Sequence, residues 1–141
     1  MNKRQADWIV KKLCPFILRE QGRGFGMNGW LTLKIRPGAI HNRDGLDRKA
    51  PSCGTIACIG GSIQFLNGSG GDDFCESAGA DIGLDSSRSR NLFYGWCNLG
   101  WPRRFRDRYA KAKTALSKAR VAVSLLKLVA KTRGKCLDTK P

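Results

Sequence analysis

The chain has 141 residues, of which 41% are hydrophobic, and it carries a formal net charge of +15. This length suits one domain built around one core. No run of 18 apolar residues is present, so no transmembrane helix is expected. Charged residues near the N-terminus interrupt the apolar stretch that a secretory signal requires. We therefore expect a cytoplasmic protein without a membrane partner.

The charge is concentrated at the two ends of the chain. Residues 1–50 contain 11 basic and 4 acidic residues, a net charge of +7. Residues 51–100 contain 2 and 5, a net charge of −3, and residues 101–141 contain 13 and 2, a net charge of +11. A field of this sign attracts phosphates or an acidic protein surface at long range.

The N-terminal third predicts one helix followed by irregular chain. Apolar residues at helical spacing predict a helix over 3–14, and Pro15 is expected to end or kink it. Residues 21–52 are basic and rich in glycine, which predicts a long irregular loop. A short strand is expected near 30–35, but the sequence shows no good second strand to pair with it.

The uncharged stretch 53–66 predicts the buried central helix. Ile56, Ile59, Ile63 and Leu66 follow the 3, 4, 3 spacing of one helical face. Ser52 and Thr55 are both candidates for its cap, and Asn67-Gly68 is expected to stop it.

Three shorter helices are predicted next. Asp72-Asp73 starts one that ends at Gly83, and Asp85 caps a second that ends with Leu92-Phe93-Tyr94. Pro102 suits the first position of a third, which runs from Arg103 to about Lys111. Phe105 and Tyr109 are expected to face the core from this third helix.

The last helix is predicted over 115–133, capped by Thr114 and closed by Gly134. Its wide apolar stripe indicates that much of it is buried. The tail 135–141 is expected to be frayed. Together these elements predict an all-α fold, a single domain over 1–141 with five to six helices.

Six cysteines lie at positions 14, 53, 58, 75, 97 and 136, with no Cys-x-x-Cys pair. Buried, reduced thiols are the main expectation, because a cytosol keeps thiols reduced. The alternatives are disulfides and a metal site, whose first ligands would be Cys53, Cys58 and His41. We expect neither a metal nor a cofactor.

Several short motifs occur in a fixed order: Cys53-Gly54-Thr55-Ile56-Ala57-Cys58-Ile59-Gly60-Gly61, Gly83-Leu84, Leu92-Phe93-Tyr94, Trp101-Pro102, Phe105-Arg106 and Tyr109. This order, with its closing amphipathic helix, resembles a small family of uncharacterised bacteriophage and bacterial proteins that have a Cys-Gly-Thr-x-x-Cys-x-x-Gly core. The match covers about residues 50–133. The chain departs from the pattern at Gly61-Ser62, where bulkier residues are more usual, and by an inserted basic stretch at 34–50. The resemblance implies origin and an all-helical fold, but no catalytic residue.

The first functional hypothesis is a basic accessory protein that binds nucleic acid, DNA or RNA. Arginine and lysine side chains supply phosphate contacts, and nearby aromatic rings stack on bases. Tryptophans 96 and 101 flank the basic cluster, although a solvated basic face with both rings in the core is the simpler interpretation. The candidate residues are Arg103, Arg104, Arg106, Arg108, Lys111, Lys113, Arg23, Phe25 and Trp101.

Two alternatives belong to other classes. The same basic surface would suit a protein-directed inhibitor of a bacterial defence nuclease, as in small phage proteins that act on host complexes. A thiol enzyme would use Cys53 near a helix N-terminus with His41 as its base. The chain has a single histidine and no paired-carboxylate motif, so we expect it not to be an enzyme.

Overall fold

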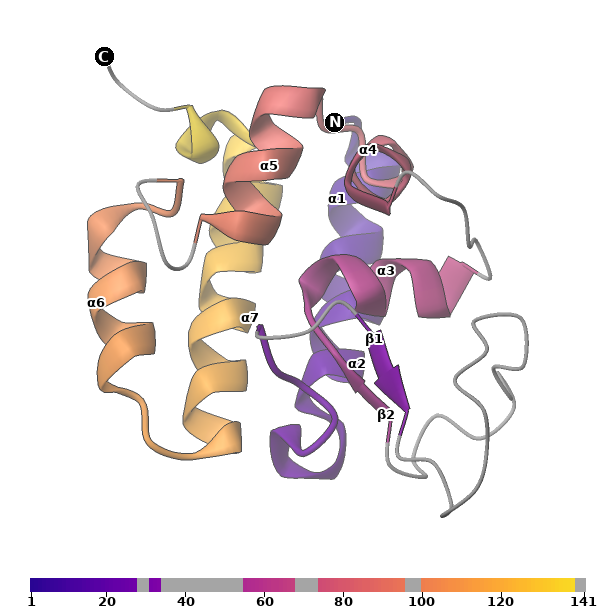
Figure 1. Cartoon of the computed structure of the whole chain (residues 1–141). Coiled ribbons are helices and arrows are strands. Elements are labelled where there is room, and N and C mark those ends of the chain that lie inside the picture. The colour runs from indigo at the N-terminus through magenta and orange to yellow at the C-terminus, as the bar shows by residue number, and fades with distance from the viewer. Residues whose placement is uncertain (28–30, 34–54, 68–73, 96–99, 139–141) are drawn as a thin grey trace.

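The computed structural model describes residues 1–27, 31–33, 55–67, 74–95 and 100–138. The fold is all-α, as predicted, with six helices, if the segmented N-terminal helix counts as one, and one small two-stranded sheet among these residues (Figure 1). None of the helices in these ranges is both long enough and apolar enough to cross a membrane.

The N-terminal helix is continuous over three segments, α1 (Lys3–Trp8), η1 (Ile9–Leu13) and α2 (Cys14–Leu18). Its start is capped by Asn2 and Gln5, whose side chains each accept a hydrogen bond from the other's backbone N–H, at 2.9 and 2.8 Å. This reciprocal pairing satisfies two donors that the first helical turn would leave unpaired.

Pro15 does not end this helix but distorts it, the second of the two outcomes expected at this residue, and one further turn follows. The segment η1 is a π-helical turn in which Cys14 N–H donates to the carbonyl of Ile9. Proline has no N–H and its ring crowds the carbonyl four residues earlier. A wider turn immediately before Pro15 makes room for the ring, so the helix continues to Leu18 and then ends in the 3₁₀ turn η2 (Arg19–Gly22).

The strand expected near 30–35 has a partner that sequence reasoning did not find. Strand β1 (Leu31–Leu33) pairs antiparallel with β2 (Thr55–Ala57), with Thr32 opposite Ile56. The helix predicted over 53–66 is therefore too long at its start, because α3 spans Ile59–Asn67. The β-branched pair Thr55-Ile56 suits a strand once β1 offers backbone partners.

Burial of α3 is confirmed, since every residue from Ile59 to Phe65 is buried. Leu66, expected on the same apolar face, is 38% exposed. Of the two expected caps, Thr55 lies in β2 instead, and Ser52 lies outside the described residues. Cys58 occupies the cap position, with its carbonyl accepting from Ser62 N–H at 2.8 Å.

The remaining helices match their predictions closely. They are α4 (Phe74–Asp81), α5 (Ser86–Tyr94), α6 (Arg103–Lys111) and α7 (Ala115–Thr132). Asp85 caps α5, accepting from the Arg88 N–H at 2.8 Å. Thr114 caps α7 by accepting from the Ser117 N–H at 3.1 Å.

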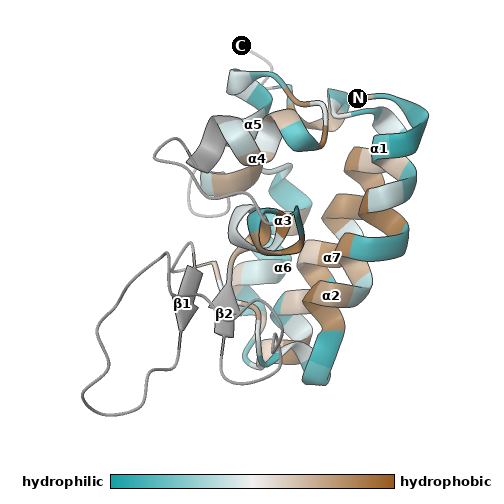
Figure 2. Ribbon diagram, turned by 90° about the vertical axis from the view of Figure 1, so that its right-hand side faces the viewer, coloured by the Kyte–Doolittle hydropathy of each residue, from teal (hydrophilic) through white to brown (hydrophobic). Residues whose placement is uncertain are grey.

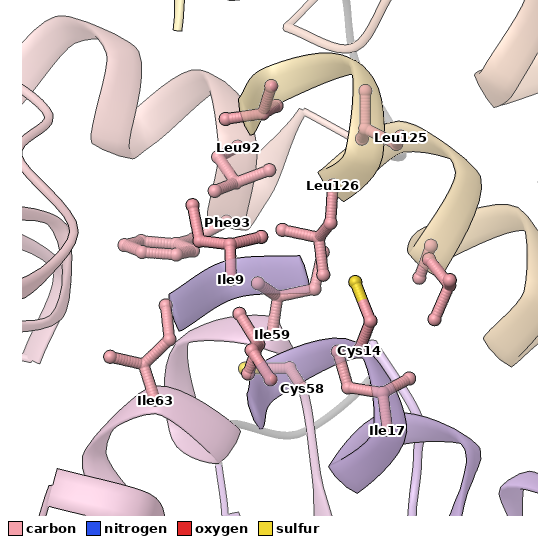
Figure 3. Close-up of a cluster of buried hydrophobic side chains, with 14 of the residues drawn as sticks. Ile9, Cys14, Ile17, Cys58, Ile59, Ile63, Leu92, Phe93, Leu125 and Leu126 are labelled. Atoms are coloured by element: carbon pink, nitrogen blue, oxygen red, sulfur yellow. The ribbon is translucent and has the colours of Figure 1, made fainter. Parts of the chain in front are cut away.

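Helix α7 is the element against which most others pack. It contacts the N-terminal helix along its length, η2, α6 and the C-terminal turn η4 (Lys135–Leu137). Apolar segments of α2 and α7 lie side by side in Figure 2. The core combines residues from four helices and the turn before α3 (Figure 3): Ile9, Cys14, Ile17, Cys58, Ile59, Ile63, Leu92, Phe93, Leu125 and Leu126.

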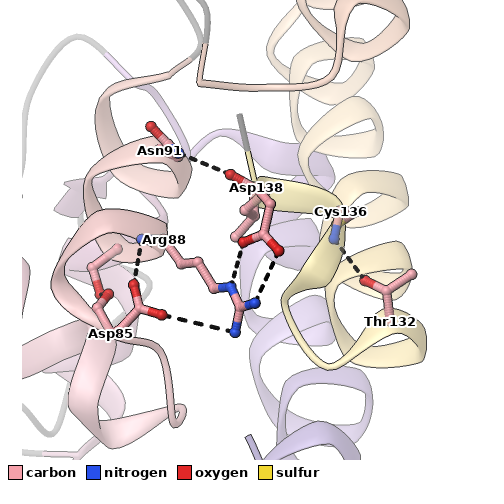
Figure 4. A network of polar contacts seen from close by, with 8 residues as sticks. Asp85, Arg88, Asn91, Thr132, Cys136 and Asp138 are labelled. Carbon is pink, nitrogen blue, oxygen red and sulfur yellow. Dashed lines mark hydrogen bonds and ion pairs between the residues drawn. The ribbon is translucent and has the colours of Figure 1, made fainter. Parts of the chain in front are cut away.

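The C-terminal tail, predicted to be frayed, is anchored as far as Asp138. Leu137 is fully buried, and its carbonyl accepts from the Asn91 side chain at 2.8 Å. The Asp138 carboxylate accepts two hydrogen bonds from the Arg88 guanidinium, at 2.7 and 3.0 Å (Figure 4). The sequence did not indicate that side chains of α5 would bind the tail. Residues 139–141 lie outside the described residues.

Candidate functional site

The inner face of α6 fixes the direction of its basic residues. Phe105 and Tyr109 are 4% and 5% exposed. The Tyr109 ring packs edge-on against Trp101 at 5.5 Å, and its hydroxyl accepts from Met27 N–H at 3.3 Å. With this face of the helix held against the core, the positions on the opposite face must face solvent.

Three of the predicted residues form an exposed row along α6. Arg104, Arg108 and Lys111 follow the i, i+4, i+7 spacing of one helical face, and all three are exposed. In the described part of the chain none of them has a carboxylate at ion-pairing distance. We call these three residues the α6 row.

Arg103 and Arg106 are engaged within the protein. The Arg103 guanidinium lies 3.7 Å from the Asp107 carboxylate, an exposed i, i+4 pair. Arg106 is half-buried, and its Nε donates to the Trp101 carbonyl at 3.1 Å. That bond holds the segment that leads into α6, so Arg106 has a structural role.

Lys113 and Arg23 lie at the end of the molecule where α6 turns into α7. Lys113 is exposed in that turn. Gly22 packs so closely on α7 that an added Cβ would lie 2.8 Å from the Ala115 carbonyl oxygen and 2.9 Å from the Ala119 Cβ. The exposed Arg23 follows directly, so the fold brings it from a distant part of the sequence to the start of α7.

The aromatic residues expected to stack on bases are part of the core. Trp101 is 1% exposed and its Nε1 donates to the Leu92 carbonyl at 2.6 Å. Phe25 is 5% exposed. Their assignment as binding residues is therefore wrong, because a buried ring has no free face. Trp96 lies outside the described residues.

A second basic row was missed by sequence reasoning. Arg120, Lys127 and Lys131 are exposed on α7, at separations of seven and four residues that put them on one face. The spacing is readable in the sequence. The apolar stripe of this helix is so wide, however, that only the packing shows which narrow face remains in solvent.

The described thiols are reduced and poorly suited to nucleophilic chemistry. Burial raises the pKa of Cys14 and of Cys58 to about 11 each. Cys58 Sγ accepts from Gly61 N–H at 3.4 Å, which acts against the burial effect without overcoming it. At neutral pH both thiols therefore stay protonated.

No group of three metal-ligating side chains is found among the described residues. The ligands considered in the sequence, Cys53 and His41, lie outside those ranges, as does the proposed thiol nucleophile, which is the same Cys53. Cys58 is 3% exposed and packs within the core.

Comparison with protein-family models, with curated proteins and with solved structures gives no match to this chain. The resemblance to a phage and bacterial family therefore stays a prediction. The charge, burial and geometry of the described surface are the basis on which a function can be assigned.

Proposed function

We propose that this protein binds nucleic acid, or a complex that contains it, through the α6 row. The observation that carries the proposal is a set of three exposed cations on one face, none of them neutralised by a carboxylate within the described residues. A helix buried on one side presents such a row with little freedom to turn away. Each side chain can then contact a phosphate and release a counterion.

The amount of charge supports a role beyond solubility. A small domain stays soluble with a net charge of magnitude about 2–8, whereas this chain carries +15. Excess positive charge raises the encounter rate with polyanions and weakens the protein's own compact state through self-repulsion. This destabilising excess of positive charge is expected in a protein whose partner is a polyanion.

The proposed role is binding without catalysis. Phosphate contacts position a protein on nucleic acid and carry no sequence information. Burial raises the pKa of each described thiol, Cys14, Cys58 and Cys136. This combination fits an accessory protein that binds many sequences with similar affinity, and a small phage-type protein would be one setting for it.

The test is to change Arg104, Arg108 and Lys111 together to Gln and measure binding to nucleic acid against salt concentration. If each side chain neutralises one phosphate of a DNA duplex, the log–log salt slope should shrink by about 2.7. Folding should be almost intact, since exposed substitutions change stability by no more than about 0.5 kcal/mol each. An unchanged slope in a folded variant would contradict the proposal.

A pull-down from host lysate separates this function from direct action on a host protein. The lysate is divided and one half is treated with nuclease. Loss of all captured material after nuclease supports nucleic-acid binding. Host proteins captured equally from both halves would contradict it and favour a protein-directed inhibitor.

A further inference from the structure

The exposed basic row on α7 consists of Arg120, Lys127 and Lys131, here called the α7 row. Positions 120, 127 and 131 fall within about 40° of one another around a helix of 3.6 residues per turn. In the described ranges no carboxylate lies at ion-pairing distance from any of them. Like the α6 row, the α7 row thus has no neutralising carboxylate within these ranges.

The two rows face the same side of the molecule. In Figure 1, α7 runs upward and α6 runs downward at its left. Phe105 and Tyr109 are buried, so their face of α6 is directed toward the core, which lies to the right of α6 in that view. Because α6 is a right-handed helix that runs downward, the α6 row is then directed toward the far side. Helix α7 packs against α6 on one side and the N-terminal helix on the other, and α5 lies in front of it in Figure 1, which leaves its exposed face on that far side as well.

Two effects of charge on pKa indicate which elements lie near the rows. Burial raises the pKa of Cys14 on the N-terminal helix, and the Lys127 charge acts in the opposite direction, so Lys127 lies near that helix. Burial likewise raises the pKa of Cys136, and the Arg104 charge opposes it. Cys136 follows the last turn of α7, so the start of the α6 row lies beside the end of α7.

The dimensions of this surface suit an extended polyanion. Arg120 and Lys131 are separated by about 16 Å along the axis of α7, and Arg104 and Lys111 by about 10 Å along α6, at 1.5 Å per residue. Packed helices lie about 8–10 Å apart. Six cations thus cover a shallow area that is wider than a single chain of phosphates.

The same two helices offer no ring for base stacking. The aromatic residues of α6 are Phe105 and Tyr109, which are buried, and α7 contains no aromatic residue. Single-strand binders rely on stacked aromatic rings in addition to a basic groove. A surface that contacts only phosphates favours the partner with the denser charge, and a duplex carries one charge per about 1.7 Å.

We propose that the α6 and α7 rows together form one binding surface for the phosphate backbone of double-stranded nucleic acid, without regard to sequence. The inference rests on the proposed function and extends it, by naming α7 as half of the surface and the duplex as the partner. The α7 row contacts phosphates, and neither row contacts the base edges.

The experiment measures fluorescence anisotropy of a 20-base-pair DNA duplex and of a 20-nucleotide oligothymidine at several salt concentrations. The wild type should bind the duplex more tightly than the single strand. The variant R120Q/K127Q/K131Q should weaken duplex binding and reduce its log–log salt slope by about 2.7, at about 0.9 per phosphate.

A matched control removes the same three charges elsewhere. Arg4, Lys12 and Arg90 are exposed on α1, η1 and α5, outside both rows. The variant R4Q/K12Q/R90Q has the same net charge as the α7 variant, so it should retain most of the wild-type salt slope if position rather than total charge matters. Circular dichroism of all variants checks that they fold.

The outcomes separate the two claims. If the wild type bound neither probe in a salt-dependent way, the proposed function would be wrong. If the α6 variant weakened binding while the α7 variant matched the R4Q/K12Q/R90Q control, the proposed function would stand and the shared surface would be overturned. Equal or tighter binding of oligothymidine would overturn the duplex as partner.

Discussion

At the scale of single residues, burial decides which side chains are available for chemistry. Cys58 stands at the start of α3, where helix N–H groups favour an anion. The side chain is only 3% exposed, and desolvation of the thiolate outweighs those donors. A thiol at the start of a helix is therefore held neutral by its surroundings.

The buried thiols predict how stability changes with pH. The pKa of Cys14 and Cys58 is about 11 in the folded protein against 9.0 for an ordinary thiol. Above pH 9 the unfolded chain loses these protons first. The contribution of the two protonated thiols to the unfolding free energy is thus complete below pH 9 and is lost as the pH rises toward 11. Each thiol contributes up to about 3 kcal/mol to this loss.

The measurement is urea unfolding under reducing conditions at pH 8, 9 and 10. The wild type should lose unfolding free energy faster than the C14A/C58A variant over this range, although the variant starts lower because it lacks two core side chains. Lysine titration is common to both proteins and cancels in the comparison. Parallel pH profiles would show that these thiols titrate normally.

At the scale of elements, helix crossings depend on small residues where two backbones approach. Gly79 on α4 faces Ser89 on α5, which is fully buried. A Cβ at Gly79 would lie 1.7 Å from Ser89 Oγ and 2.6 Å from its Cβ. Neither helix can accept that atom without moving, and α5 also holds the C-terminal tail through Arg88 and Asn91.

Gly79→Ala should therefore destabilise the protein by about 1–3 kcal/mol, the usual range for overpacking, even though alanine favours a helix more than glycine does. Ala80→Ser, at the exposed neighbouring position on α4, is the matched control and should stay within about 0.5 kcal/mol of the wild type. Urea unfolding followed by circular dichroism compares the three proteins. Equal stability of the two variants would mean that α4 and α5 are farther apart than described.

At the scale of the whole molecule, repulsion within the basic surface destabilises the folded state. The α6 and α7 rows place six like charges on neighbouring helices. Their mutual repulsion extends over about 30 Å at 0.01 M ionic strength and about 10 Å at 0.1 M. A bound polyanion would both satisfy these charges and remove the repulsion.

The thermal midpoint of the free protein should accordingly rise with salt. Raising sodium chloride from 0.01 to 0.3 M should add about 1 kcal/mol of stability, about 4 °C for a chain of this size. A variant with all six row residues changed to Gln should show a smaller rise and a higher midpoint at low salt. Calorimetry of both proteins provides the comparison, and an equal salt response would show that the rows do not repel each other measurably.

The all-α class, the bounds of α4 to α7 and the exposed face of α6 were readable from the sequence, because each depends on local signals. Helical periodicity, caps such as Asp85 and Thr114, and the closing Gly134 act within a few residues of chain. The α6 row follows from the spacing of Phe105 and Tyr109 in the same way.

The tertiary structure decided what depends on distant partners. Residues 55–57 form a strand because β1 lies beside them. The tail is ordered because the side chains of Arg88 and Asn91 donate hydrogen bonds to it. Trp101 is buried with its Nε1 donating to the Leu92 carbonyl, and the elements packed against α7 decide which of its faces stays exposed. Such contacts join residues far apart in the chain, so no local pattern contains them. Spacing sets which face a residue occupies, and only packing sets whether that face is covered.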